Sequence, residues 1–275
     1  MADDELTGRQ VDKYLRILGV QKSAPGIQAL TEITRAHITR IPFENISKLY
    51  YLNKYNLRSI PDTDLYLEGI EKYNFGGTCY SNNYYLHLLL KSLGYNVKLC
   101  GADMSQPDVH IVNIVDLNGS EYLVDGGNAA PFLEPIPRDT GSDYSITSGN
   151  SVYNLKPADN MGRSEMQLFR NGELIHNYIA KPEPRNIDYF TDVIIDSFSP
   201  GSTFMNAVLL TRFNENKSVV IHNYTVIETE NSSYKKSKLK SRAELTNAIN
   251  VRFGIPAEFS IQAISTIARF KDVWN

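Results

Sequence analysis

Apolar side chains recur at helical spacing in the amino-terminal part of the chain. Between Val11 and Gly19 they occupy positions 11, 14, 15 and 18, the stripe of an amphipathic helix that a glycine ends. Further helices are predicted over residues 30–40, 64–73 and 79–93. The first of these stops ahead of Pro42, and the last begins after Thr78, a favourable cap, and ends at Gly94.

From Tyr95 onward the pattern changes to short β-rich runs. Asn118-Gly119 is the strongest short hairpin signal in the chain, and Asn171-Gly172 marks a second hairpin. After a break at residues 197–201, the pattern becomes mixed. The predicted strands cover residues 109–117, 121–124, 167–170, 174–175, 207–213 and 218–227, and a closing helix covers 241–253. This order of elements indicates an α+β protein.

Composition places the chain among ordinary globular proteins. Of its 275 residues, 42% are hydrophobic and 21% are charged. The net charge of −3 argues against a broad nucleic-acid interface, and no apolar run is long enough to predict a membrane span. The first ten residues, MADDELTGRQ, lack the features of a signal peptide, and two cysteines do not suggest a disulfide framework. We therefore expect a reducing, cytoplasmic location.

Basic residues cluster once, in residues 234–242 (YKKSKLKSR). The ordinary interpretation of such a run is a solvated loop, and contact with a phosphate-bearing ligand is the alternative.

Cys79 is the candidate nucleophile. It follows Gly76-Gly77-Thr78 and begins an apolar helix, where the positive end of the helix dipole and the free N–H groups stabilise a thiolate. The glycines would let the backbone turn tightly and leave room for a substrate. For an isolated cysteine a buried structural role is the better interpretation, and we give Cys100 that role.

The Asn118-Gly119 hairpin supplies partners for Cys79. With a two-residue turn, Leu117 pairs with Ser120, and Asp125 then lies opposite Val112. His110 is one pleat from Val112, so His110 and Asp125 are diagonal neighbours on one face, with Cβ atoms roughly 7 Å apart. A histidine held by a carboxylate and facing a cysteine is the nucleophile–base–orienter arrangement. Taken singly, His110 could be a solvated strand residue and Asp125 a turn cap.

The remaining histidines and the motif search add no second site. We expect His37 on a helix surface and His87 in the core, and no carboxylate is placed to orient His176 or His222. No pattern has zinc-ligand spacing, so no metal is expected, and no phosphate-binding glycine motif of the nucleotide folds occurs.

Motifs along nearly the whole chain resemble the arylamine N-acetyltransferase family. In chain order they are YLRILG at 14–19, Arg35-Ala36-His37, IPFEN at 41–45, GGTC at 76–79 with Asn83, His110, VDGG at 124–127, SPGSTF at 199–204 and VRFGIP at 251–256. The resemblance implies a helical bundle, a β-barrel and an α/β lid, with the cysteine on a papain-like helix. These parts correspond to residues 1–94, 95–196 and 197–275.

The resemblance also implies a chemistry. Acetyl-CoA would acetylate Cys79, with His110 as base and Asp125 as orienter, and an arylamine, hydrazine or N-hydroxyarylamine would then take the acetyl group in a ping-pong reaction. Residues Gly126-Gly127-Asn128 would lie near the CoA pyrophosphate. Glycines there would leave backbone N–H groups free to bind phosphate, and an ordinary turn is the alternative.

Two positions depart from the family pattern. Phe75 stands where the family usually has Arg, and Ser81 where it usually has Glu. Without that Arg, Glu44 needs another partner, contact with water or a proton. Two rival functions stay open: a cysteine hydrolase of papain or transglutaminase type, and a non-catalytic relative that binds CoA or a partner protein.

Overall fold

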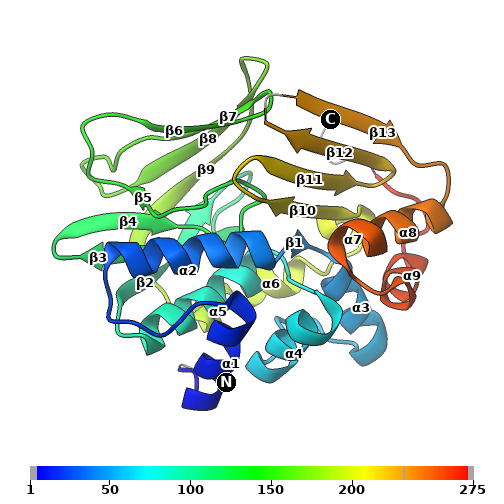
Figure 1. The fold of residues 1–275 in the computed structure, drawn as a ribbon, viewed down its shortest axis with the longest axis horizontal. Helices are drawn as coiled ribbons and strands as arrows, with labels where there is room; N and C mark the ends of the chain where they lie inside the picture. The colour runs from blue at the N-terminus through cyan, green and yellow to red at the C-terminus, as the bar shows by residue number, and fades with distance from the viewer. Residues whose placement is uncertain (1–4, 232, 272–275) are drawn as a thin grey trace.

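The computed structural model describes residues 5–231 and 233–271. Its amino-terminal helices are α1 (Gly8–Leu18), α2 (Ile27–Arg40), α3 (Ile46–Tyr55), α4 (Thr63–Tyr73) and α5 (Cys79–Ser92). Helix α1 begins with a capping box between Thr7 and Gln10 and ends at Gly19 in the left-handed conformation. Helix α5 is buried along most of its length and packs against the sheet through β2 and β3, so it forms the centre of the molecule (Figure 1).

An eight-stranded antiparallel sheet follows the helices. Its strands are β2 (Asn96–Asp103), β3 (His110–Leu117), β4 (Ser120–Val124), β5 (Ile136–Pro137), β6 (Tyr144–Ser148), β7 (Ser151–Leu155), β8 (Ser164–Arg170) and β9 (Glu173–Pro184). Their spatial order is β5-β4-β3-β2-β9-β8-β7-β6. The two edges approach each other, because Tyr144 at the start of β6 donates a hydrogen bond to Glu134 beside β5. The sheet is therefore a nearly closed barrel around its own apolar core.

A second sheet carries the carboxyl-terminal part of the chain. It consists of β1 (Phe43–Glu44), β10 (Leu209–Phe213), β11 (Lys217–His222), β12 (Thr225–Glu230) and β13 (Ser233–Lys238), in that spatial order. Helices α8 (Arg242–Phe253) and α9 (Ala257–Ser265) pack against it and against α3. Three short helices, η1 (Ile187–Phe190), α6 (Thr191–Asp196) and α7 (Thr203–Asn206), connect the two sheets. Strand β1 lies between helices α2 and α3 in the chain. The second sheet therefore contains one strand from the amino-terminal helical part.

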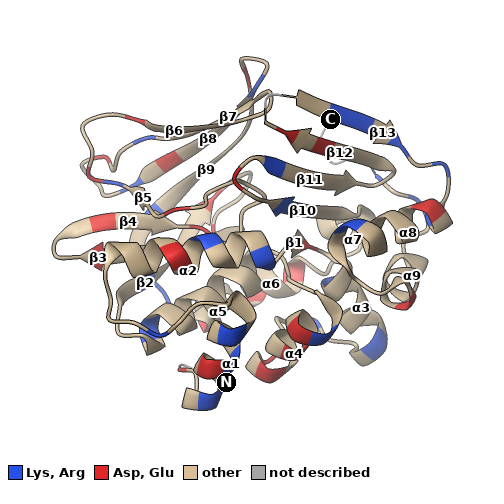
Figure 2. Cartoon of the chain, in the orientation of Figure 1, with Lys and Arg blue, Asp and Glu red and all other residues tan. Residues whose placement is uncertain are grey.

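The α+β fold class is confirmed, three local predictions are corrected, and one helix was missed. Residues 46–55 form helix α3, which was not predicted. The predicted strand 218–227 is two strands, because Asn223 adopts a positive φ and turns the chain. The basic run contributes edge strand β13 rather than a loop, with Lys235 opposite Glu228 (Figure 2). Helix 241–253 does not close the fold, because α9 follows it.

Within residues 5–231 and 233–271, no helix combines the length and apolar character needed to cross a membrane.

Candidate active site

The two glycines before Cys79 permit a close approach between backbones. A Cβ atom on Gly76 would lie 1.9 Å from the carbonyl oxygen of Pro42, and one on Gly77 would lie 2.8 Å from Cβ of Ser81. The Gly77 carbonyl accepts a hydrogen bond of 3.0 Å from the Glu44 N–H. Gly76 is thus needed because Pro42, just before β1, lies against it, and Gly77 because Ser81 in the first turn of α5 lies against it. Thr78 occupies the expected cap position, but its side chain makes no capping hydrogen bond.

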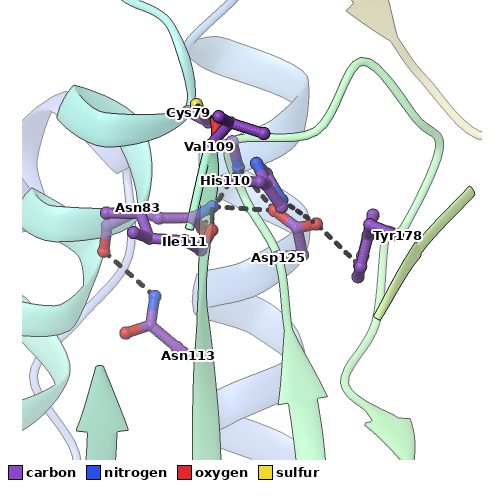
Figure 3. A network of polar contacts seen from close by, with 9 residues as sticks. Cys79, Asn83, Val109, His110, Ile111, Asn113, Asp125 and Tyr178 are labelled. Atoms are coloured by element: carbon purple, nitrogen blue, oxygen red, sulfur yellow. Dashed lines mark hydrogen bonds and ion pairs between the residues drawn. The ribbon is translucent and has the colours of Figure 1, made fainter. Parts of the chain in front are cut away.

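Cys79 is buried at the first turn of α5, with 9% of its surface exposed. Its Sγ lies 3.9 Å from the carbonyl oxygen of Val109, the residue before β3. A hydrogen bond with Cys79 is one of the interactions that favour the charged form of His110. The start of α5 and the start of β3 therefore bring the thiol and the imidazole together (Figure 3).

His110 and Asp125 form a direct hydrogen bond. Leu117 pairs with Ser120 and Asn113 with Val124, which is the register expected from a two-residue turn. His110 Nε2 lies 2.9 Å from Asp125 Oδ2, and each residue is only 1% exposed. Since Nε2 is engaged by the carboxylate, Nδ1 is the ring nitrogen left for Cys79.

The Asp125 carboxylate accepts three hydrogen bonds besides that of His110. Oδ1 accepts from Asn83 Nδ2 at 2.8 Å and from the Gly127 N–H at 3.2 Å, and Oδ2 accepts from the Tyr178 hydroxyl at 2.8 Å (Figure 3). One oxygen thus caps the following turn while the other orients the imidazole. The two roles that the sequence left as alternatives coexist.

The electrostatics of the pair favour ionisation of both members. Burial acts to raise the pKa of Asp125, but the charge and hydrogen bond of His110, with the bonds from Asn83 and Tyr178, bring it below its ordinary value. Burial acts to lower the pKa of His110, but the Asp125 charge and the hydrogen bonds to Asp125 and Cys79 raise it to about 10. A buried carboxylate thus supports an imidazolium next to the thiol.

Asn83 and Tyr178 complete the network. Asn83 lies one turn along α5 from Cys79. It donates hydrogen bonds of 2.6 Å to the Ile111 carbonyl and 2.8 Å to Asp125, and it accepts one of 3.1 Å from the Gly127 N–H. The sequence marked Asn83 only as part of a motif. Tyr178 was missed entirely, because its contact depends on the pairing of β9 with β2 and no local pattern marks it.

The Gly126-Gly127-Asn128 loop packs directly on α5. A Cβ on Gly127 would lie 2.6 Å from Asn83 Nδ2 and 2.8 Å from Cα and O of Cys79, and a Cβ on Gly126 would lie 2.7 Å from His37 Cδ2. The Gly127 N–H is used by Asn83 and Asp125, so it is not free for phosphate. Asn128 Nδ2, in contrast, is buried and has no hydrogen-bond partner in the described part of the chain.

The Glu44 carboxyl group is hydrogen-bonded to backbone N–H groups. Its carboxyl accepts from the Ser47 N–H at 2.9 Å and the Gly76 N–H at 3.0 Å, and burial raises its pKa. Phe75 fills the neighbouring space and packs on the rings of Tyr50 and Phe259, with centroids 5.8 and 5.5 Å away. An aromatic cluster thus replaces the Arg of the family pattern.

Two of the other histidines differ from expectation. His37 is fully buried rather than on a surface, its Nδ1 lies 3.1 Å from the Tyr14 hydroxyl, and burial lowers its pKa to about 3. His87 is half-buried rather than in the core, and burial lowers its pKa to about 4. Both are therefore neutral near pH 7. His176 lies on β9 and His222 on β11.

Over the described residues, 5–231 and 233–271, no three or more His, Cys, Asp or Glu side chains are arranged to hold a metal ion.

Comparison with known proteins identifies the family. A family model described as N-acetyltransferase matches residues 26–261. The chain belongs to the arylamine N-acetyltransferase family. It is 34% identical over 174 residues to "Arylamine N-acetyltransferase, pineal gland isozyme NAT-3" of Gallus gallus, an alignment that covers 60% of this chain and 57% of that protein. A second Gallus gallus isozyme, NAT-10, is 26% identical over 228 residues, 74% of this chain and 77% of that protein.

Solved structures of arylamine N-acetyltransferases share the fold. The enzyme from Mycobacterium abscessus superimposes with a TM-score of 0.78 at 18% identity, covering 94% of this chain and 95% of that one. The Mycobacterium marinum enzyme, solved in complex with CoA, gives a TM-score of 0.77 at 19% identity, covering 94% and 99%.

Proposed function

We propose that the chain transfers an acetyl group from acetyl-CoA to a small aromatic amine, hydrazine or N-hydroxyarylamine through a thioester on Cys79. The observation that carries this proposal is the buried chain of contacts from Cys79 through His110 to Asp125, within a member of the arylamine N-acetyltransferase family.

The first half-reaction uses all three side chains. His110 takes the thiol proton, and the Cys79 thiolate attacks the thioester carbonyl. The bond between the acetyl carbon and the CoA sulfur breaks, and the imidazolium of His110 returns a proton to the departing CoA thiolate. Asp125 keeps the imidazole oriented and supports its positive charge in between.

The second half-reaction transfers the acetyl group onward. The amine nitrogen attacks the acetyl-Cys79 carbonyl while His110 accepts a proton from the amine. The bond between the acetyl carbon and Cys79 Sγ breaks, and the Cys79 thiolate is released next to the His110 imidazolium. Because CoA leaves before the amine attacks, both substrates can use one site in turn. The kinetics should therefore be ping-pong.

We place the CoA pyrophosphate near Gly126 and Asn128. The unpartnered Asn128 Nδ2 is a donor that an anion could engage, which supports this placement. The M. marinum enzyme, which shares this fold, was solved as a complex with CoA. Gly127 is left out of the phosphate contact because its N–H already serves Asn83 and Asp125.

The proposed location is the cytoplasm. Cys79 and Cys100 are both free thiols, which fits a reducing compartment. We propose no nucleic-acid partner, in keeping with a net charge of −3.

Steady-state kinetics test the proposal against its two rivals. CoA release from acetyl-CoA is followed with and without an aniline acceptor, at several concentrations of each substrate. We expect parallel double-reciprocal lines, strong acceleration by the amine, and no turnover in Cys79→Ala. Equal CoA release without the amine would favour a hydrolase, and no CoA release under any condition would favour a binding protein.

A further inference from the structure

A lysine lies in a cleft beside the proposed nucleophile and has no role in the reaction described above. The cleft runs between the start of α5 and the segment around α6, and its lining includes Lys48 of α3, Thr78 and Tyr80 on either side of Cys79, and Ser197 and Phe198. Cys79 is not among the lining residues, but it is near enough for its charge to act on the Lys48 ammonium. A substrate group bound at Cys79 would therefore lie close to Lys48.

The partners of Lys48 are all neutral. Its Nζ donates to the carbonyl oxygen of Ser197 at 3.0 Å and to the Ser197 hydroxyl at 2.5 Å, and it lies 3.9 Å from the centre of the Phe198 ring. Among the described residues no carboxylate forms an ion pair with it, whereas Lys181 is paired with both Asp103 and Asp108. A half-buried cation is thus held without a counter-ion.

The position of Lys48 is unfavourable for stability. It is the third residue of α3, where the helix dipole disfavours a positive charge. Burial lowers its pKa to about 8, and the negative charge of Cys79 opposes this drop. No carboxylate in the described part of the chain is paired with Lys48, and Cys79 loses its charge once it carries an acyl group. A substrate that brings an anion would then supply the missing partner.

We infer that Lys48 is a specificity-determining residue that binds a carboxylate on the substrate, carried either by the acyl group or by the acceptor amine. A carboxylate fits better than a phosphate, because one ammonium with neutral neighbours balances a single charge. The inference rests on the proposed function and deepens it, since it names the substrate class of the same site.

The test compares matched charged and neutral substrates on the full-length chain. In the first arm, intact-protein mass spectrometry follows loading of Cys79 without amine, from malonyl-CoA or from acetyl-CoA. In the second arm, acetyl transfer is measured to 4-aminobenzoate or to its neutral amide, 4-aminobenzamide. Each arm gives the ratio of the rate with the charged substrate to the rate with the neutral substrate. General effects of a substitution on the fold or on the thiol cancel in this ratio.

Lys48→Met should lower one of the two ratios about ten- to a hundredfold, the range for loss of a hydrogen bond between charged groups. The arm that changes identifies whether the acyl group or the acceptor carries the carboxylate. Lys54→Met is the matched control, because Lys54 lies on the same helix, is exposed and contacts Tyr50 rather than the cleft. Both of its ratios should equal those of the wild type.

Ser197→Asp is a second variant that keeps Lys48 in place. It puts a carboxylate next to Nζ and should lower the same ratio as Lys48→Met by competing with the substrate. Wild-type ratios in both variants, with acetyl-Cys79 still formed, would overturn the inference and leave the proposed function intact. Failure of either acyl-CoA to load wild-type Cys79 would overturn the proposed function, and this inference with it.

Discussion

Tyr178→Phe isolates one hydrogen bond to the Asp125 carboxylate. The change removes the hydroxyl that donates a hydrogen bond of 2.8 Å to Asp125 Oδ2. The aromatic ring stays packed against the His110 ring, with the two ring centroids 4.9 Å apart. Hydrogen bonds to charged groups contribute about 1.5–3 kcal/mol. Because Oδ2 keeps its bond from His110, we expect the lower part of that range, about 1.5–2 kcal/mol of unfolding free energy.

Urea unfolding at pH 7 measures this difference. Tyr153→Phe is the matched control, since Tyr153 is buried in the same sheet and its hydroxyl has no hydrogen bond to the described residues. The control should stay within about 0.5 kcal/mol of the wild type. Equal effects of the two substitutions would show that the Tyr178 hydroxyl does not stabilise a charge on Asp125.

The pH dependence provides a second check on the same variant. The pKa of Asp125 is lowered in the folded protein, so its carboxylate stabilises the fold above its unfolded pKa of about 3.9, and this stabilisation is lost as the pH falls. The gap between wild type and Tyr178→Phe should therefore be constant near neutral pH and narrow below about pH 4. A gap that persists unchanged in acid would assign the effect to packing.

Three further substitutions address the rest of the network. Asp125→Asn should lower acetyl-transfer turnover on the order of a thousandfold or more, measured by steady-state kinetics, while CoA binding changes little. A small loss of turnover would show that Asp125 is not the orienter of His110. Gly127→Ala should cost about 1–3 kcal/mol in thermal unfolding, because its Cβ would lie 2.8 Å from backbone atoms of Cys79; wild-type stability would mean that the loop can move away. His110→Gln should keep the fold and slow alkylation of Cys79 by iodoacetamide, and an unchanged alkylation rate would assign the base to another residue.

The contact between His110 and Asp125 could be predicted because it is local. The Asn118-Gly119 turn fixes the register of the hairpin, and the register fixes which side chains share a face. The contact between Tyr178 and Asp125 could not, because these residues are 53 positions apart and meet only through the closure of the barrel. The sequence therefore indicated Cys79, His110, Asp125 and, through its motif, Asn83, but not Tyr178.

Helix α3 was missed although its buried residues Ile46, Leu49 and Tyr50 have the i, i+3, i+4 spacing of a helix. Its tyrosines are typical of strands, but Tyr50 packs against Phe259 of α9, with ring centroids 4.9 Å apart, and this tertiary contact selects the helix. The prediction of a single strand over residues 218–227 was wrong for a different reason. Its β pattern is correct on both sides of Asn223, and the turn between them depends on a single residue with positive φ.

Departures from the family pattern were visible in the sequence, and their consequences were not. Glu44 was expected to need a new partner, and the structure provides the backbone N–H groups of Ser47 and Gly76. These partners could not be predicted because they depend on how β1 meets the start of α5. The neutral surroundings of Lys48 were invisible for the same reason, since Ser197 is 149 positions away.

Mass spectrometry of the intact protein after mixing with acetyl-CoA, in the absence of any amine, tests the central proposal most directly. We expect one acetyl group per chain, located on Cys79 by peptide mapping, lost on addition of an arylamine and absent in Cys79→Ala. An acetyl group on another residue, or one that persists in Cys79→Ala, would contradict the proposed thioester mechanism.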